Sequence, residues 1–322
     1  MAPERRTKSG WSAIDIPPMA GRRVVVTGAN SGLGLQTSLE LARRGASVTM
    51  ACRDPKRGAD ALAKVRSQSG AGDVRLASLD LADLASVRRF AEEHDGPVDV
   101  LVNNAGVMAV PEGRTKDGFE TQFGTNHLGH FALTGLLLPA LRQGTDPRVV
   151  VVSSAAHRSG RIDFDDLQGL ARYRRWKAYG QSKLANLLFA RELDRRLRAH
   201  GDELIVASAH PGIAATNLMG PIAKSTGPFA GVVTALVKRT SQSDAEGALP
   251  SLYAASMPDV VGGDYFGPDG FGEQRGAPKR VGRTARAQDD AVAARLWSVS
   301  SELTGVVYPD LPDPVGTPGT AA

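Results

Sequence analysis

Hydrophobic residues in this chain form short, nearly continuous runs that alternate with longer stretches of helical periodicity. The apolar runs are 23–27 (RVVVT), 47–52, 74–78, 98–103, 148–153 and 204–210. Helical patterns lie between them and after them, for example at 33–44, 56–69, 84–94, 119–142 and 179–198. Short buried strands that alternate with helices are typical of a parallel sheet covered by helices on both faces. We therefore predict an α/β fold with a doubly wound parallel sheet.

No linker interrupts this alternation, so we expect a single domain, 21–305, preceded by an N-terminal extension, 1–20. A segment of glycine, proline and small apolar residues, 213–240, breaks the rhythm, and we predict a mobile flap there. A turn is expected at 267–270 (GPDG), and a final helix over 285–303 that packs Trp297 against the core. The last residues, 306–322, are so rich in Pro and Gly that we expect a loose tail.

The composition of the chain is that of a soluble globular protein. It has 322 residues, 42% of them hydrophobic, and a net charge of +5. The single cysteine, Cys52, permits no intramolecular disulfide. No apolar run reaches the roughly 18 residues of a membrane helix, and the first ten residues lack the apolar core of a signal peptide. We predict a cytoplasmic protein with no integral membrane segment.

Two local clusters have the residue types of binding sites for other partners. His127 and His130 are three positions apart, but no third ligand at suitable spacing accompanies them, so we predict no metal site. The run 172–176 (RYRRW) mixes cations with aromatic residues, yet so short a run is more often a solvated rim. The basic residues are otherwise scattered, and we predict no nucleic-acid partner.

A glycine-rich turn, TGANSGLG, follows the first apolar run and opens the first helical pattern. Glycines at this place let the backbone turn tightly, approach a pyrophosphate and pack helix on strand, which favours a dinucleotide on a Rossmann-type sheet. The candidate cofactor-binding residues here are Gly28, Asn30, Ser31, Gly32, Leu33 and Gly34. The GxxxGxG spacing differs from the usual fingerprint, and a purely structural turn is the alternative.

Further candidates follow the third and fourth apolar runs. Asp80 and Leu81 combine a carboxylate and an apolar neighbour that can frame an adenine. Asn104, Ala105 and Gly106 stand at the end of the fourth run, where ligands of open α/β sheets bind.

Tyr179 and Lys183 are four residues apart at the start of a helical pattern, so both project from one face. A nearby ammonium favours the phenolate and brings a phenol toward a useful range for acid–base work at neutral pH. The alternative is a half-buried aromatic residue beside a solvated lysine.

Taken in order, these motifs resemble the short-chain dehydrogenase/reductase family over about residues 20–305. The motifs are TGANSGLG, LDLADL, NNAG, TNHLGHF, Ser154, YGQSK and HPG with Thr216. The segments ACRD, FGTNHLGHF and AYGQSKLANLLFARELDRRL are most similar to the branch that contains retinol dehydrogenases and their bacterial relatives.

The resemblance implies a role for each candidate. A nicotinamide would carry the hydride. Tyr179 would move the proton of the alcohol oxygen, while Lys183 would hold the nicotinamide ribose and lower the pKa of Tyr179. Asn126 would support a water that links Lys183 to solvent, with a helix-bending asparagine as the alternative. Pro211, Gly212 and Thr216 would lie at the nicotinamide end, Thr216 on its carboxamide.

Ser154 follows the fifth apolar run, where its hydroxyl can hydrogen-bond a substrate carbonyl. Ser153 competes for that role, and the resemblance assigns it to Ser154. Ser154 and Tyr179 are 25 positions apart, more than is common in the family, which implies an insertion around 158–176 at the edge of the substrate cleft.

The residues after the second apolar run bear on the choice of cofactor. An acid there grips the ribose 2′-hydroxyl of NAD, whereas an arginine accommodates the 2′-phosphate of NADP. Here Cys52 replaces the acid and Arg53 follows it, so NADP(H) is favoured and NAD(H) is the alternative. The alternative is an Arg53 that pairs with Asp54 or faces solvent.

The sequence therefore predicts an NADP(H)-dependent oxidoreductase that interconverts a carbonyl and an alcohol on a partly hydrophobic small molecule. A cofactor-binding module without turnover is the alternative, and a nicotinamide-dependent epimerase or dehydratase is disfavoured by the spacing of the glycine-rich turn. A homo-oligomer is a further expectation, since the family often dimerises through the helix that bears Tyr179 and the next long helix.

Overall fold

The computed structural model describes residues 10–70, 73–212 and 242–311. The predicted flap with Thr216 lies outside these residues. Residues 1–9 of the predicted extension and 312–322 of the predicted tail also lie outside them.

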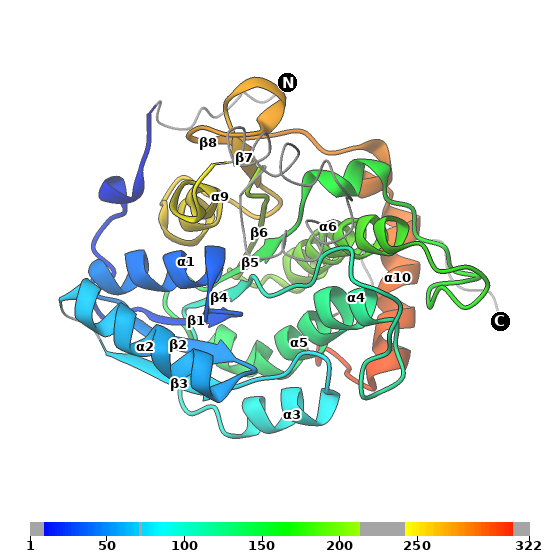
Figure 1. Ribbon diagram of the computed structural model, residues 1–322, viewed down its shortest axis with the longest axis horizontal. Coiled ribbons are helices and arrows are strands. Elements are labelled where there is room, and N and C mark those ends of the chain that lie inside the picture. The colour runs from blue at the N-terminus through cyan, green and yellow to red at the C-terminus, as the bar shows by residue number, and fades with distance from the viewer. Residues whose placement is uncertain (1–9, 71–72, 213–241, 312–322) are drawn as a thin grey trace, which may run out of the picture.

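Eight strands form one sheet in the order β3-β2-β1-β4-β5-β6-β7-β8 (Figure 1). They are β1 (Arg23–Thr27), β2 (Ser47–Cys52), β3 (Val74–Ser78), β4 (Val100–Asn103), β5 (Arg148–Val152), β6 (Ile205–Ala209), β7 (Tyr265–Pro268) and β8 (Pro278–Arg280). All neighbours run parallel except β7 and β8. Val25 of β1 pairs with Thr49 on one side and Leu101 on the other, so the strand order reverses between β1 and β4. Ligands of doubly wound sheets bind at such a reversal.

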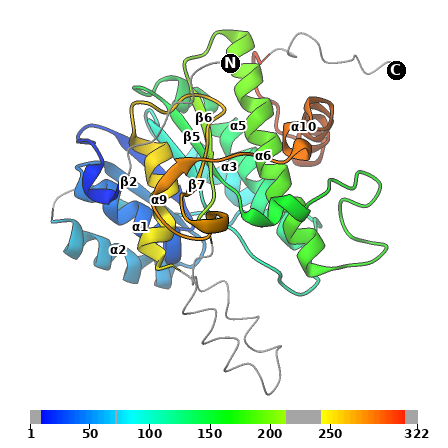
Figure 2. The same ribbon diagram turned by 90° about the horizontal axis from the view of Figure 1, so that it is seen from above.

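Helices cover both faces of the sheet, which confirms the predicted fold class (Figure 2). One layer contains α1 (Gly32–Arg43), α2 (Pro55–Ser69) and α9 (Asp244–Ser256). The other contains α3 (Leu84–Glu92), α5 (Gly129–Arg142) and α6 (Arg175–His200), with α10 (Asp290–Thr304) outside α6. The shorter turns are η1 (Ala13–Asp15), α4 (Thr121–Phe123), η2 (Gly124–Leu128), η3 (Ala155–Ser159), η6 (Phe271–Glu273) and η7 (Ala285–Gln288).

The final helix packs as predicted, and the chain stays packed beyond it. Trp297 of α10 lies against Phe131 and Phe189 of α5 and α6. Val306 and Tyr308 are also buried, and the Tyr308 hydroxyl donates to the carbonyl of Phe131 at 2.7 Å. The expectation of a loose tail from residue 306 is therefore wrong for these first residues, because their apolar side chains fill a place beside α5.

The part of the predicted N-terminal extension that the structure describes is packed as well. Trp11, Ile16 and Met19 are buried in the same core as α1 and α9. The Trp11 ring meets that of Tyr253 on α9, with 5.1 Å between centroids. These three residues are separated by proline and short polar interruptions and form no helical or strand periodicity, which hides their contribution in the sequence.

Three further elements differ from the prediction. The helix expected at 119–142 is interrupted by the π-helical turn η2, and α6 begins four residues before Tyr179, at Arg175. Gly267 and Pro268, expected in a turn, belong to β7. The elements α9, β7 and β8 were not predicted.

Candidate active site

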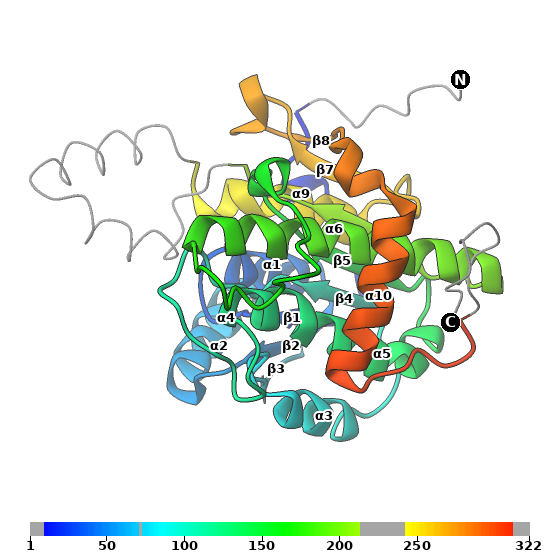
Figure 3. The ribbon, with the colours of Figure 1, turned by 90° about the vertical axis from the view of Figure 1, so that its right-hand side faces the viewer.

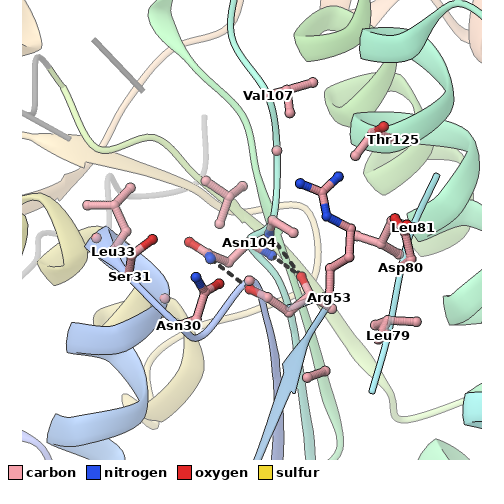
Figure 4. A pocket seen from close by; sticks show the side chains of 18 of the residues that line it. Asn30, Ser31, Leu33, Arg53, Leu79, Asp80, Leu81, Asn104, Val107 and Thr125 are labelled. Carbon is pink, nitrogen blue, oxygen red and sulfur yellow. Dashed lines mark hydrogen bonds between the residues drawn. The ribbon is translucent and has the colours of Figure 1, made fainter. Parts of the chain in front are cut away.

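A cavity of about 350 Å³ opens at the carboxyl ends of β1, β2, β4 and β5. Figure 4 shows Asn30, Ser31 and Leu33 on one side of it and Leu79, Asp80 and Leu81 on the other. The predicted site residues that line it are Gly28, Asn30, Ser31, Gly32, Leu33, Gly34, Arg53, Asp80, Leu81, Asn104, Ala105, Gly106, Tyr179, Lys183 and Pro211. The chain thus brings distant motifs together at the reversal of strand order.

The glycine-rich turn has the geometry that only glycine tolerates. Gly28 has a φ of 65°, in the left-handed region. A Cβ on Gly34 would stand 2.5 Å from the Gly28 carbonyl oxygen and 2.5 Å from the Asn104 amide nitrogen. The first turn of α1 therefore lies directly against the loop after β4. Apart from neighbouring residues of the chain, no described atom lies within 4 Å of the Cβ position of Gly32, so the space beside this residue is open.

Thr27, just before this turn, organises the floor of the cavity. Its Oγ1 accepts the backbone N–H groups of Asn104 and Ala105, both at 2.9 Å. The same oxygen lies 2.9 Å from Nε2 of His130, whose Nδ1 faces the Asn126 carbonyl at 2.9 Å. A carbonyl needs a donor, so Nδ1 carries the proton and Nε2 accepts from the Thr27 hydroxyl. His130 is thus a structural residue, as predicted.

Asn126 lies in the π-helical turn η2 and is fully buried. Its Oδ1 accepts the Val107 N–H at 2.8 Å, and its Nδ2 donates to the Val107 carbonyl at 2.9 Å. Nδ2 also donates to the Ser182 hydroxyl at 3.0 Å, one residue before Lys183. The side chain of Asn126 therefore joins the loop after β4 to the helix that bears Tyr179 and Lys183.

Ser154 and Ser153 point to different partners. Ser154 forms a side-chain hydrogen bond with Tyr179, and its Oγ accepts the Ala156 N–H at 3.2 Å as the N-cap of η3. Ser153 instead donates to the Lys183 carbonyl at 2.7 Å. The geometry places Ser154, rather than Ser153, beside the Tyr179 hydroxyl.

Tyr179 and Lys183 are both nearly buried on α6. The ammonium lies 5.9 Å from the centre of the tyrosine ring and donates to the Val152 carbonyl at 3.2 Å. Burial lowers the pKa of Lys183 to about 8. Burial also raises the pKa of Tyr179, and the hydrogen bond with Ser154 opposes that rise. In the chain alone, the cost of burying the phenolate therefore outweighs the expected depression of the Tyr179 pKa.

At the far end of the cavity two arginines stand together. Arg53 follows β2, and Arg57 lies in the first turn of α2; both line the cavity and are exposed. The Asp54 carboxylate caps α2 by accepting the Arg57 N–H at 3.0 Å. Within the described ranges no ion pair links a carboxylate to either guanidinium.

The predicted insertion folds against the loop after β4. The Tyr173 hydroxyl donates to the Val110 carbonyl at 2.9 Å, and Gln122 of α4 donates to both Tyr173 and the Arg175 carbonyl. Trp176, 52% exposed, meets the Tyr179 ring edge to face with 6.2 Å between centroids. The insertion thus ends with the Trp176 ring in contact with the Tyr179 ring.

Several lining residues were missed from the sequence. They are Thr27, Ala51, Asp54, Arg57, Leu79, Val107, Thr125, Val152 and Ser153. Arg57 had a usable signal, because it stands four positions after Arg53 at the start of a helix.

No group of three or more His, Cys, Asp or Glu side chains among the described residues is arranged to hold a metal ion. Among the helices of that part of the chain, none combines the length and apolarity needed to cross a membrane.

A doubly wound sheet with a glycine-rich turn at its strand reversal, and a buried Tyr–Lys pair across the same cavity, defines an NAD(P)-dependent oxidoreductase. The chain belongs to the short-chain dehydrogenase family, whose model matches residues 22–227.

Its similarity to individual proteins extends over most of its length. It is 43% identical to retinol dehydrogenase 12 of Mus musculus over 300 residues, which cover 92% of this chain and 89% of that protein. It is 40% identical to polyprenol dehydrogenase of Mus musculus, with 94% and 89% covered. A crystal structure of an uncharacterized protein from Mycobacterium paratuberculosis shares 50% identity and a TM-score of 0.78, covering 94% of this chain and all of that one.

Proposed function

We propose that this protein is an NADP(H)-dependent oxidoreductase that interconverts a carbonyl and a primary or secondary alcohol on a partly hydrophobic small molecule. The observation that carries the proposal is a cavity lined by Tyr179 and Lys183 at one end and by Arg53 and Arg57 at the other. Ser154 does not line this cavity, but it is hydrogen-bonded to Tyr179. A dinucleotide would join these two ends.

The cavity fits such a cofactor in its shape and polarity. The turn from Gly28 to Gly34 would hold the pyrophosphate at the start of α1, where backbone N–H groups are unpaired. Asp80 and Leu81 would frame the adenine. Asn104, Ala105 and Gly106 would line the middle of the cofactor, and Pro211, Gly212 and Thr216 its nicotinamide end.

The preference for NADP(H) rests on charge. Arg53 and Arg57 are two exposed cations without a carboxylate partner among the described residues, while Asp54 is turned toward the N-terminus of α2. A 2′-phosphate would supply the missing anion, and arginine binds phosphate in a bidentate manner.

Proton transfer is assigned to the Tyr179 hydroxyl. A bound nicotinamide supplies a hydride to the carbonyl carbon in reduction and accepts one from the alcohol carbon in oxidation. Tyr179 gives its proton to the carbonyl oxygen as that oxygen gains charge, and takes the proton back in the reverse direction. Ser154 donates a hydrogen bond to the same oxygen, and the Lys183 ammonium favours the phenolate that Tyr179 becomes.

The proposed substrate class is supported by the aromatic contact beside Tyr179 and by the names of two relatives. Trp176 presents a half-exposed aromatic surface that contacts the Tyr179 ring. The relatives are named for retinol and polyprenol, both alcohols with long apolar chains. A carbonyl or alcohol with an apolar body is therefore the expected substrate.

The test is NADPH oxidation against aliphatic, aromatic and polycyclic carbonyls, together with NADPH binding, for the wild type and Tyr179→Phe. Turnover should fall by about a hundredfold or more in the variant, because only the transferable proton is lost, while NADPH affinity should stay within about twofold. Tyr308→Phe is the control, since it removes a buried hydroxyl that bonds Phe131 instead. Unchanged turnover in Tyr179→Phe would contradict the mechanism.

A further inference from the structure

A network of hydrogen bonds outside the cavity joins three loops near the end proposed to hold the nicotinamide. His210, which follows β6, is 1% exposed, and its Nε2 lies 3.0 Å from a carboxylate oxygen of Glu273 in η6. Arg158 of η3 donates to the same Glu273 oxygen at 2.6 Å. The loops that leave β5, β6 and β7 therefore meet at one carboxylate.

The hydrogen bonds fix the protonation of the His210 ring. Burial, together with neighbouring His157 and Arg158, lowers the pKa of His210 to about 3, so the ring is neutral near pH 7. The backbone N–H of Gly212 donates to Nδ1 at 3.2 Å. Nδ1 must therefore be the acceptor, and Nε2 carries the only ring proton and donates it to Glu273.

The local backbone is shaped for this contact. A Cβ on Gly267 would clash with the His210 ring, and a Cβ on Gly212 would clash with the Gln274 carbonyl. Glu273 itself has a φ of 57°, an uncommon conformation for a residue with a side chain. Such strain persists only where surrounding contacts hold it in place.

The hydrogen bonds that start at Glu273 reach, through His210, the Pro211–Gly212 turn, which is part of the proposed cofactor site. Pro211 lines the cavity, and its carbonyl accepts a hydrogen bond from Gln242. Gly212 follows directly and is held by the His210 ring and the Gln274 backbone. The position of this turn therefore depends on how His210 is oriented.

We propose that Glu273 is a positioning residue for the nicotinamide half of the cofactor, acting through His210 on the Pro211–Gly212 turn. This inference rests on the proposed function, because it takes that turn as part of the cofactor site. Glu273 does not line the cavity, so it acts without touching the cofactor. Losing its carboxylate leaves the His210 N–H buried without a partner, and the ring and turn then shift to find one.

The test compares two ligands in Glu273→Ala, Glu273→Gly and Glu273→Gln. NADPH spans the whole cavity, whereas adenosine 2′,5′-bisphosphate occupies only the end with Arg53. Glu273→Ala should weaken NADPH binding about tenfold and leave bisphosphate binding within about twofold. Glu273→Gly should weaken NADPH binding to the same extent as Glu273→Ala. Glycine tolerates the positive φ at this position, so this variant should fold even if Glu273→Ala does not. Glu273→Gln should stay near wild type, because its amide oxygen still accepts from His210.

Exposed Glu302 on α10 provides a matched control, and Glu302→Ala should change neither affinity. Unchanged NADPH binding in Glu273→Ala, or an equal loss for both ligands, would overturn the positioning role while leaving the proposed function intact. A wild-type protein that binds neither ligand would instead overturn the proposed function and the inference with it.

Discussion

Thr27 Oγ1 lies 2.9 Å from Nε2 of His130 beneath the glycine-rich turn, and it accepts two backbone N–H groups from the loop after β4. One hydroxyl thus contacts three polar groups from two other segments, although the Asn104 N–H also bonds the Val102 carbonyl at 2.9 Å. The floor of the cofactor cavity depends on this single side chain.

Thr27→Val keeps the shape of the side chain and removes that hydroxyl. We expect the free energy of unfolding to fall by about 2 kcal/mol, because the Ala105 N–H loses its acceptor and the buried Nε2 of His130 loses its donor. Urea unfolding measures the change. Thr37→Val is the matched control: Thr37 is equally buried and its hydroxyl has no hydrogen-bond partner among the described residues, so its loss should cost little. Equal losses in both variants would show that Thr27 matters only through its shape.

Arg53→Ala and Arg57→Ala should each weaken NADPH binding by about tenfold or more and leave NADH binding nearly unchanged, since NADH has no 2′-phosphate. The measurement is a titration of cofactor fluorescence with both nucleotides. Lys56→Ala removes an exposed cation between the two that does not line the cavity, and it should affect neither. A similar loss for NADH would mean that the arginines bind another part of the cofactor.

His127→Gln should reduce the sensitivity of the fold to acid. Burial lowers the pKa of His127 from 6.5 to about 3. Between these values the unfolded chain binds a proton that the folded chain does not, so stability is highest above pH 6.5 and falls as pH drops toward 3. The slope is about 1.4 kcal/mol per pH unit for each such histidine. Burial also lowers the pKa of His130 and His210, which add to this slope.

The measurement is urea unfolding at pH 4.5, 5.5 and 6.5. The slope for His127→Gln should be smaller than that of the wild type by about one proton. His200→Gln, which removes a histidine at the exposed end of α6, is the control. Equal slopes in the two variants would contradict the role assigned to burial.

The six strands predicted from the sequence are all present. Five of them are mainly apolar and almost entirely buried, whereas β3, at the edge of the sheet, is partly exposed. β7 and β8 are four and three residues long and contain glycine or proline, so they carry no such signal. α9 is hidden by its small residues and by Pro250, although Ser243 and Glu246 form the capping box that begins it.

In the site, the residues that the sequence predicts each belong to a short local motif. Tyr179 and Lys183 share a helix face, so their spacing alone brings them together. Glu273 contacts His210 across 63 positions, and Thr27 contacts His130 across 103. Such contacts depend on how loops from separate strands meet, which no local pattern encodes.

α10 and Tyr308 cover α5 and α6 on the side away from the sheet, as Figure 3 shows for α10. Trp297 stacks on Phe189, and Arg196 of α6 lies over the same indole, 4.7 Å from its centre. The helix that carries Tyr179 and Lys183 thus receives its outer support from its own chain.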